Sequence, residues 1–172
     1  MKKVTREYAL NILRNNRSVA SLDEIPELST WDVSEITDFS MFFNCNRILK
    51  DIKALSNWNV SNGVSFALMF GSCYVLEDLS PISNWDVSNG VNFSSMFNYC
   101  RSLKNLSPLS HWNVSKGSGF YCMFHSCDVL DSLLGIVNWS VPKKLDVNFM
   151  FGVNRYPREP QIEWLNKNIK RQ

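Results

Sequence analysis

Apolar residues recur along this chain with a fixed period. Three aliphatic residues precede each repeated tryptophan by nine, six and three positions, as Leu103, Leu106 and Leu109 precede Trp112. A period in the twenties is typical of solenoids, because one such repeat cannot bury its apolar face alone and stacks on its neighbours. The tryptophans that stand 27 residues apart are Trp31, Trp58, Trp85, Trp112 and Trp139.

The second half of each repeat carries another apolar pattern. In the fourth repeat it consists of Phe120, the pair Met123–Phe124 and Cys127, and the second and third repeats have the same spacing. In the first repeat the corresponding Met41 and Cys45 stand one position early. This offset predicts a local bulge in the first repeat.

The spacing also predicts local elements. The segment F-S-S-M-F-N-Y-C-R-S-L, residues 93–103, has apolar residues three and four apart and predicts a short helix or 3₁₀ turn. The L-x-x-L-x-x-L run favours a very short strand, because Pro81 and Pro108 interrupt it. If such strands pair, the coils lie about 4.8 Å apart. Gly63, Gly90 and Gly117 follow the tryptophans by five residues and predict a turn with positive φ.

Both ends of the repeat region predict helical caps within a single domain, residues 1–172. Residues 1–21 form the N-terminal cap, the repeats span 22–155, and residues 156–172 form the C-terminal cap helix. Thr5 is the expected N-cap. The expected apolar stripe of the first helix is Tyr8, Ala9, Ile12 and Leu13, and that of the second is Ile162, Leu165 and Ile169.

The repeat W-D-V-S-N-G-V-N-F-S-S-M-F-N-Y-C, from Trp85 to Cys100, resembles the BspA-like repeat family, a branch of leucine-rich repeats in bacterial surface lipoproteins and mobile elements. The resemblance covers about residues 22–155. It implies an α/β, leucine-rich-repeat-like right-handed solenoid of about five 27-residue coils with helical caps at both ends. The chain departs from the family pattern in its Val-Ser after Trp-Asp and in lacking an export signal. Because members of such families differ in role, the resemblance implies little about function.

Composition and charge narrow the class of protein. Apolar content of 45% and charged content of 20% indicate a globular chain, and a net charge of +2 is too small to predict nucleic-acid or membrane binding. Arg6, Glu7 and Asn11 interrupt the place of a signal-peptide core, and no lipobox or membrane-length apolar run occurs. We therefore expect a cytoplasmic protein with no membrane partner, or a surface location if the chain is a fragment of a longer protein.

The sequence predicts no catalytic, metal-binding or cofactor site. No C-x-x-C pair occurs, so free, buried thiols are expected, with Cys122 the best candidate for exposure. His125 lies two residues from Cys127, but that cysteine belongs to the repeat and no partner orients the base. The Asp or Asn after each of the first four tryptophans is expected to cap its own turn rather than bind a cation, and Ser140 follows the fifth.

These observations favour a non-enzymatic protein-binding scaffold. Tyrosine and arginine are frequent interface anchors, so exposed positions that vary between repeats are the candidate contacts. The expected role is an intracellular inhibitor or adaptor, for example an anti-defence protein such as an anti-CRISPR from a phage or mobile element. A fragment of a bacterial surface adhesin and a nucleic-acid-binding protein that uses its basic C-terminal end are the alternatives. The candidate partner-binding residues are Tyr74, Tyr99, Arg101, Tyr121, His125 and Asp128. The basic C-terminal cluster is Lys143, Lys144, Arg155, Arg158, Lys167, Lys170 and Arg171.

Overall fold

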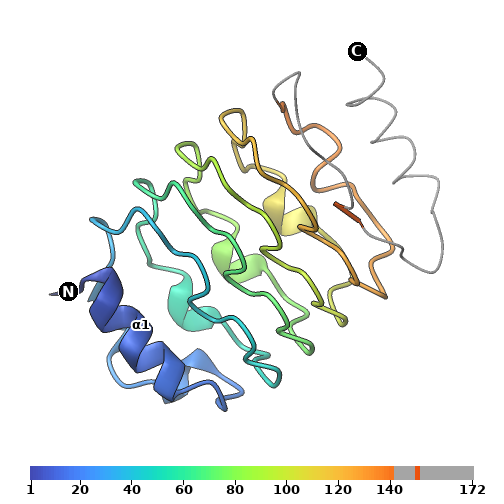
Figure 1. Ribbon diagram of the computed structural model, residues 1–172. Helices are drawn as coiled ribbons and strands as arrows, with labels where there is room; N and C mark the ends of the chain where they lie inside the picture. Colours follow the sequence, from blue (N-terminus) through green and yellow to red (C-terminus); the bar gives the residue numbers. More distant parts are fainter. Residues whose placement is uncertain (142–149, 152–172) are drawn as a thin grey trace.

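The repeats form coils that lie side by side in sequence order (Figure 1). The structure is a computed structural model that describes residues 1–141 and 150–151. The expected C-terminal cap helix and the basic C-terminal cluster lie outside the described residues. Isolated parallel bridges join Asp38 to Ser65, Ser65 to Asn92 and Asn92 to Gly119, so equivalent residues of successive coils are hydrogen-bonded neighbours.

Regular elements are short in this part of the chain. Strand β1 pairs in parallel with β2, with Lys2 opposite Trp31. The 3₁₀ helices η3, η4 and η5 stand in a row along one side of the stack (Figure 1). The elements are β1 (Lys2–Lys3), α1 (Arg6–Asn15), η1 (Leu22–Glu24), η2 (Leu28–Thr30), β2 (Trp31–Asp32), η3 (Lys53–Leu55), η4 (Ser80–Ile82) and η5 (Ser107–Leu109).

The sequence predicted a short helix or a 3₁₀ turn in the Phe-to-Cys half of each coil, and in the part of the chain that the structure describes there is a run of turns there and no helix. Alternate N–H groups donate to the next coil over 2.7–3.0 Å, while the N–H groups between them bond three residues back in their own coil. Leu68 and Ser72 have φ of 57° and 60°, in the left-handed region. A left-handed residue at every fourth position prevents a continuous helix. The N–H groups of this half therefore alternate between acceptors in the next coil and acceptors in their own coil. The inter-coil donors of the second coil are Phe66, Leu68, Phe70 and Ser72, and their acceptors are Asn92, Ser94, Met96 and Asn98.

The other half of each coil contains the 3₁₀ helices where the sequence favoured a strand. Asp78 accepts a hydrogen bond from the N–H of Ser80 at 2.8 Å, and Asp51 and Asn105 do the same for η3 and η5. Pro81 lies in the first turn of η4, where its missing N–H leaves no helical bond unmade. Along the described coils, the pairing that the apolar run suggested is limited to isolated parallel bridges beside these capped turns, from Ser21 to Asp51 and from Asn105 to Ser132.

The first repeat has no bulge, contrary to the sequence expectation. Met41 and Cys45 have φ of 63° and 65° and occupy the same left-handed positions as Leu68 and Ser72. Phe42 and Phe43 therefore take the places of the later Met-Phe pairs. Asn46 takes the buried cysteine position, where its Nδ2 donates to the carbonyl of Val19 at 3.1 Å.

Aromatic side chains stack along the axis of the coils. The rings of Phe39 and Phe66 lie 5.5 Å apart and nearly parallel, and those of Trp85 and Trp112 are stacked at 6.5 Å. The tryptophans of the repeats are 2–5% exposed. Four of their indole N–H groups donate over 3.0–3.2 Å to carbonyls 30 residues earlier. Each of these four indoles therefore fills the core and donates a hydrogen bond to a backbone carbonyl of the preceding coil.

The glycines of the turn after the tryptophan serve close packing rather than positive φ, which corrects the sequence prediction. None of Gly63, Gly90 and Gly117 has a left-handed φ. A Cβ on Gly90 would overlap the ring of Phe93, which is held between two stacked phenylalanines, and would lie 2.9 Å from the Val87 carbonyl. The ring leaves no room for any side chain at this position.

Helix α1 covers the N-terminal end of the stack (Figure 1). Thr5 is its N-cap and accepts from the N–H of Tyr8, which confirms the predicted cap. Ala9, Leu10 and Leu13 are buried in the same core as the repeats, whereas Tyr8 is 39% exposed. Ala9 and Leu13 of the predicted stripe are therefore confirmed, Ile12 is half-buried against the core, and Leu10 is buried where Tyr8 was expected.

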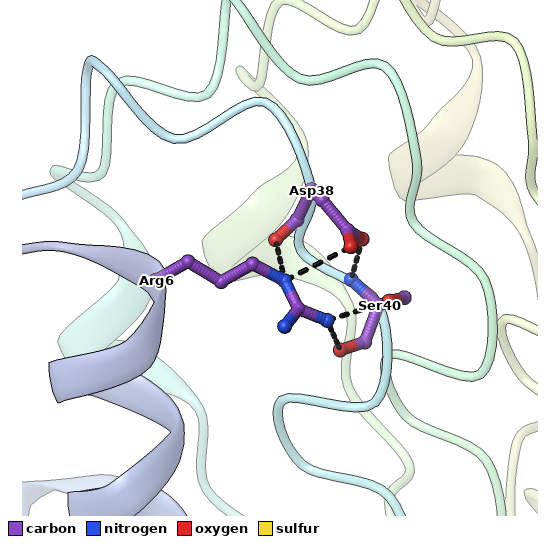
Figure 2. A network of polar contacts seen from close by, with 3 residues as sticks. All are labelled: Arg6, Asp38 and Ser40. Carbon is purple, nitrogen blue, oxygen red and sulfur yellow. Dashed lines mark hydrogen bonds and ion pairs between the residues drawn. The ribbon is translucent and has the colours of Figure 1, made fainter.

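Arg6 binds the open edge of the first coil (Figure 2). Its Nε donates to the carbonyl of Asp38 at 2.9 Å and lies 2.9 Å from the Asp38 carboxylate, and its Nη2 donates to Ser40 Oγ at 3.0 Å. In the next coil the equivalent carbonyl, of Ser65, accepts the N–H of Phe39. The guanidinium therefore takes the place of a preceding coil, and an exposed ladder edge is avoided.

Replacing Arg6 with alanine is expected to lower the free energy of unfolding by about 1–3 kcal/mol, because charge-assisted hydrogen bonds to the first coil are lost. Arg14→Ala, at an exposed position on the same helix, should change it by less than about 0.5 kcal/mol. Urea denaturation followed by tryptophan fluorescence measures both values. Equal effects of the two substitutions would contradict the edge-capping role.

Candidate functional site

Four surface side chains form a row across successive coils. Arg47, Tyr74, Arg101 and Asp128 stand 27 residues apart, immediately after the buried cysteine position, and we call them the Arg47–Asp128 row. Tyr74 is half-buried and the other three are exposed. The residue before each member of the row is buried in the core, which fixes the backbone of the turn that carries the row.

The members of this row contact one another. The guanidinium carbons of Arg47 and Arg101 lie 5.4 and 4.9 Å from the ring centre of Tyr74, within range of cation–π attraction. Arg101 Nε lies 3.8 Å from Asp128 Oδ2, and both side chains are more than half exposed. An ion pair so exposed contributes little stability, so Asp128 does not lock Arg101 in place.

Two further residues predicted to bind a partner, Tyr99 and His125, are connected to the row by ring contacts. The Arg101 guanidinium lies 5.6 Å from the ring centre of Tyr99, and the Tyr99 ring lies 5.7 Å from that of His125. His125 Nδ1 is 2.9 Å from Ser126 Oγ. Contacts therefore connect five of the six residues that the sequence singled out. Tyr121, which is 48% exposed, occupies a different row of the coil.

The sequence analysis missed two parts of this surface. Arg47 was overlooked because the first repeat was aligned one residue out of register, although it stands 27 residues before Tyr74. Ile48, Val75 and Val129 follow the row by one residue and are 49%, 37% and 42% exposed, with Ser102 between them. An apolar strip therefore runs beside the charged and aromatic row.

The repeated cysteines are held for packing rather than for reaction. Cys127 Sγ donates to the carbonyl of Phe97 at 3.3 Å, and Cys100 and Cys73 make the same bond one and two coils earlier. Burial raises the pKa of all three thiols. Cys122 is buried and Cys45 is exposed, so the prediction that Cys122 is the exposed thiol is wrong.

The Asp and Asn residues after the tryptophans cap their own turns, as predicted. Each side-chain oxygen accepts from the N–H two residues on, at 3.0–3.1 Å. Hydrogen bonds from Ser34 and Ser88 lower the pKa of Asp32 and Asp86. Within the described residues no group of three or more His, Cys, Asp or Glu side chains is placed to hold a metal ion. The capping residues are Asp32, Asn59, Asp86 and Asn113.

These features define a protein built from stacked 27-residue repeats, with a row of arginine, tyrosine and aspartate side chains in contact on its surface. The family described as "Mycoplasma protein of unknown function, DUF285" matches residues 13–106 and 77–164, and the chain belongs to this family. No curated protein and no solved structure matches the chain. In the part of the chain that the structure describes, no helix has the length and apolar character needed to cross a membrane.

Proposed function

We propose that this chain is a non-enzymatic protein-binding scaffold whose partner contacts the Arg47–Asp128 row together with Tyr99 and His125. The observation that carries the proposal is the continuous set of cation–π and ring contacts from Arg47 to His125 across four coils. Tyrosine and arginine are the side chains that most often dominate binding energy at protein interfaces.

The side chains of the Arg47–Asp128 row are already restricted by their contacts, which favours binding. Each arginine already lies against an aromatic ring, so less side-chain entropy is lost when a partner docks. The coils beneath are tied by inter-coil hydrogen bonds of 2.7–3.0 Å, which hold the row in one arrangement. A partner therefore meets a preformed surface.

The arrangement of the reactive residue types supports a non-enzymatic role. Cys127 directs its thiol to a backbone carbonyl, while His125 contacts Ser126 and Tyr99. A thiol whose pKa is raised by burial is a poor nucleophile at neutral pH. We therefore assign these two residues to packing and to the binding surface.

We also propose that residues 22–155 as a whole form a BspA-like, leucine-rich-repeat-like right-handed solenoid, and that the chain acts as an inhibitor or adaptor. The 27-residue spacing of the bridges from Asp38 to Gly119 supports the first part. Linear surfaces of this kind suit contact with an extended segment of another protein. A nucleic-acid-binding role would instead give binding that weakens steeply with salt.

Substituting Tyr99 and Tyr121 should weaken partner binding without destabilising the fold. Asparagine suits position 99, because Tyr99 has a φ of 60° and asparagine tolerates the left-handed region. We expect Tyr99→Asn with Tyr121→Ala to reduce partner capture at least about tenfold, while the melting temperature changes by less than about 2 °C.

The measurement is affinity capture from the cells that encode the chain, with quantitative mass spectrometry of wild type against variant. His111→Ala is the matched control, since His111 is exposed at another position of the coil. A fall in melting temperature with unchanged capture would refute the assignment.

A further inference from the structure

We infer that the Arg47–Asp128 row recognises an extended acidic segment of the partner, with carboxylates three residues apart and an apolar side chain between them. The inference rests on the proposed binding function and names the chemistry of its partner. It follows from where charge and apolar surface stand along the axis of the coils.

The basic residues of this surface lie in two coils that are separated by one coil. Arg47 and Lys50 lie in one coil, and Arg101 and Lys104 lie two coils further on. The coil between them presents Tyr74 and Val75, the latter 37% exposed. A ligand that runs along the stack therefore meets a basic site, an aromatic and apolar site, and a second basic site.

The spacing of these sites fits a peptide in the extended polyproline II conformation. Backbone-paired coils lie about 4.8 Å apart, so two coils advance about 10 Å. A polyproline II chain rises about 3.1 Å per residue with three residues per turn, so side chains three residues apart lie on the same face, about 9 Å from each other. Arg47 and Arg101 both lie within 5.4 Å of the Tyr74 ring centre, which is consistent with such a separation. Acidic side chains at the first and fourth positions would then reach the two guanidinium groups.

The N–H groups of Arg47 and Arg101 are available to bind carboxylates. An arginine that stacks its face on an aromatic ring still has its N–H edge available for bidentate hydrogen bonds. Among the described residues Arg47 makes no ion pair within 4.0 Å. Arg101 has only the exposed 3.8 Å contact to Asp128, which an incoming carboxylate can displace at small cost.

The same surface disfavours a nucleic acid. Glu77 lies in the coil between the two basic coils, and Asp128 and Asp131 lie in the coil after them. A continuous phosphate backbone would bring negative charge against these carboxylates. A peptide with acidic residues only at every third position places no charge in the coil of Glu77, and its apolar side chain can pack on Tyr74 and Val75.

The test uses the full chain and a short fluorescein-labelled peptide with two glutamates three positions apart and leucines between them. Fluorescence anisotropy should show that it binds at least about tenfold more tightly than the same peptide with glutamines, because charge-assisted hydrogen bonds are lost. Arg47→Ala and Arg101→Ala should each weaken binding about tenfold, and Arg47→Lys should weaken it less than Arg47→Ala.

The matched control is Lys116→Ala, which removes one positive charge from a different turn and should leave peptide affinity unchanged. Melting temperatures of all variants establish that losses of affinity are not losses of fold. Equal binding of the glutamate and glutamine peptides, or unchanged affinity in Arg47→Ala and Arg101→Ala, would overturn the inference. So would tighter binding of an oligothymidylate probe that depends on the same two arginines.

The two proposals fail in different ways. If the acidic peptide does not bind but Tyr99→Asn with Tyr121→Ala still abolishes capture of a cellular partner, the scaffold stands and only the acidic specificity falls. If the peptide does not bind and those variants leave capture unchanged, both proposals fall.

Discussion

Replacing Trp85 with alanine is expected to lower the free energy of unfolding by about 4 kcal/mol, near the middle of the range for buried tryptophan truncations. Trp85 is 5% exposed, stacks on Trp112 at 6.5 Å and lies 6.4 Å from the Phe66 ring. Its removal leaves a large void in the middle of the stack. The void cannot close, because the coils on both sides are fixed by backbone hydrogen bonds to each other.

Two companion variants give this prediction its controls. Trp85→Phe keeps most of the ring but leaves the Leu55 carbonyl, which Trp85 Nε1 reaches at 3.2 Å, without its donor, and should cost about 1–3 kcal/mol. His111→Ala, at an exposed position, should cost less than about 0.5 kcal/mol. Denaturant midpoints by circular dichroism measure all three. A cost below about 1 kcal/mol for Trp85→Ala would mean that this indole does not hold the coils together.

Stability should fall steeply above about pH 9, because the folded state keeps three thiols protonated that the unfolded chain ionises. Burial raises the pKa of Cys73, Cys100 and Cys127, whereas an unfolded cysteine ionises near pKa 8.5. Below the unfolded pKa both states bind these protons and the full stability is present. Above it the unfolded state binds fewer protons, so each thiol lowers the free energy of unfolding by up to about 1.4 kcal/mol per pH unit and the three together by about 4.

Urea midpoints between pH 7 and pH 10 under reducing conditions measure this slope. Cys100→Ala should reduce the slope by about one third, because it removes one of the three buried thiols. Stability that stays constant between pH 8 and pH 10 would contradict the burial of the thiols.

Features that depend on residue type alone could be predicted from the sequence. The buried indole and phenylalanine rows follow from large apolar side chains at a constant 27-residue spacing, since stacked repeats bring like residues together. The capping by Asp32 and its equivalents follows from the habit of Asx side chains to bond the backbone two residues on. Thr5 as an N-cap follows from similarly local chemistry.

Features that depend on contacts between coils could not be predicted from the sequence. Leu68 and Ser72 are left-handed although neither residue favours that conformation, at a cost of about 1–2 kcal/mol each. Hydrogen bonds to the next coil offset this cost, and no local pattern announces them. Gly90 resembled a positive-φ glycine because the Phe93 ring that excludes a side chain there is held in place by phenylalanines of the two neighbouring coils.

The candidate surface was found only in part for a related reason. Tyr99, Arg101 and His125 stood out as residue types that anchor interfaces, but their mutual contacts depend on the register of the stack. Because the first repeat was one residue out of register in the sequence alignment of the repeats, Arg47 was not recognised as the equivalent of Tyr74 and Arg101. The partnership of Arg6 with Asp38 spans 32 residues, and only the folded end of the stack explains it.

Site-specific photo-crosslinking tests the binding account most directly. A photoreactive amino acid placed at Tyr74, in the centre of the row, is compared with the same amino acid at the exposed position His111, in cells that encode the chain. The account predicts a discrete protein adduct at position 74 that is absent at 111 and is lost when Arg101→Ala is added. No protein adduct at position 74, or equal adducts at both positions, would contradict it.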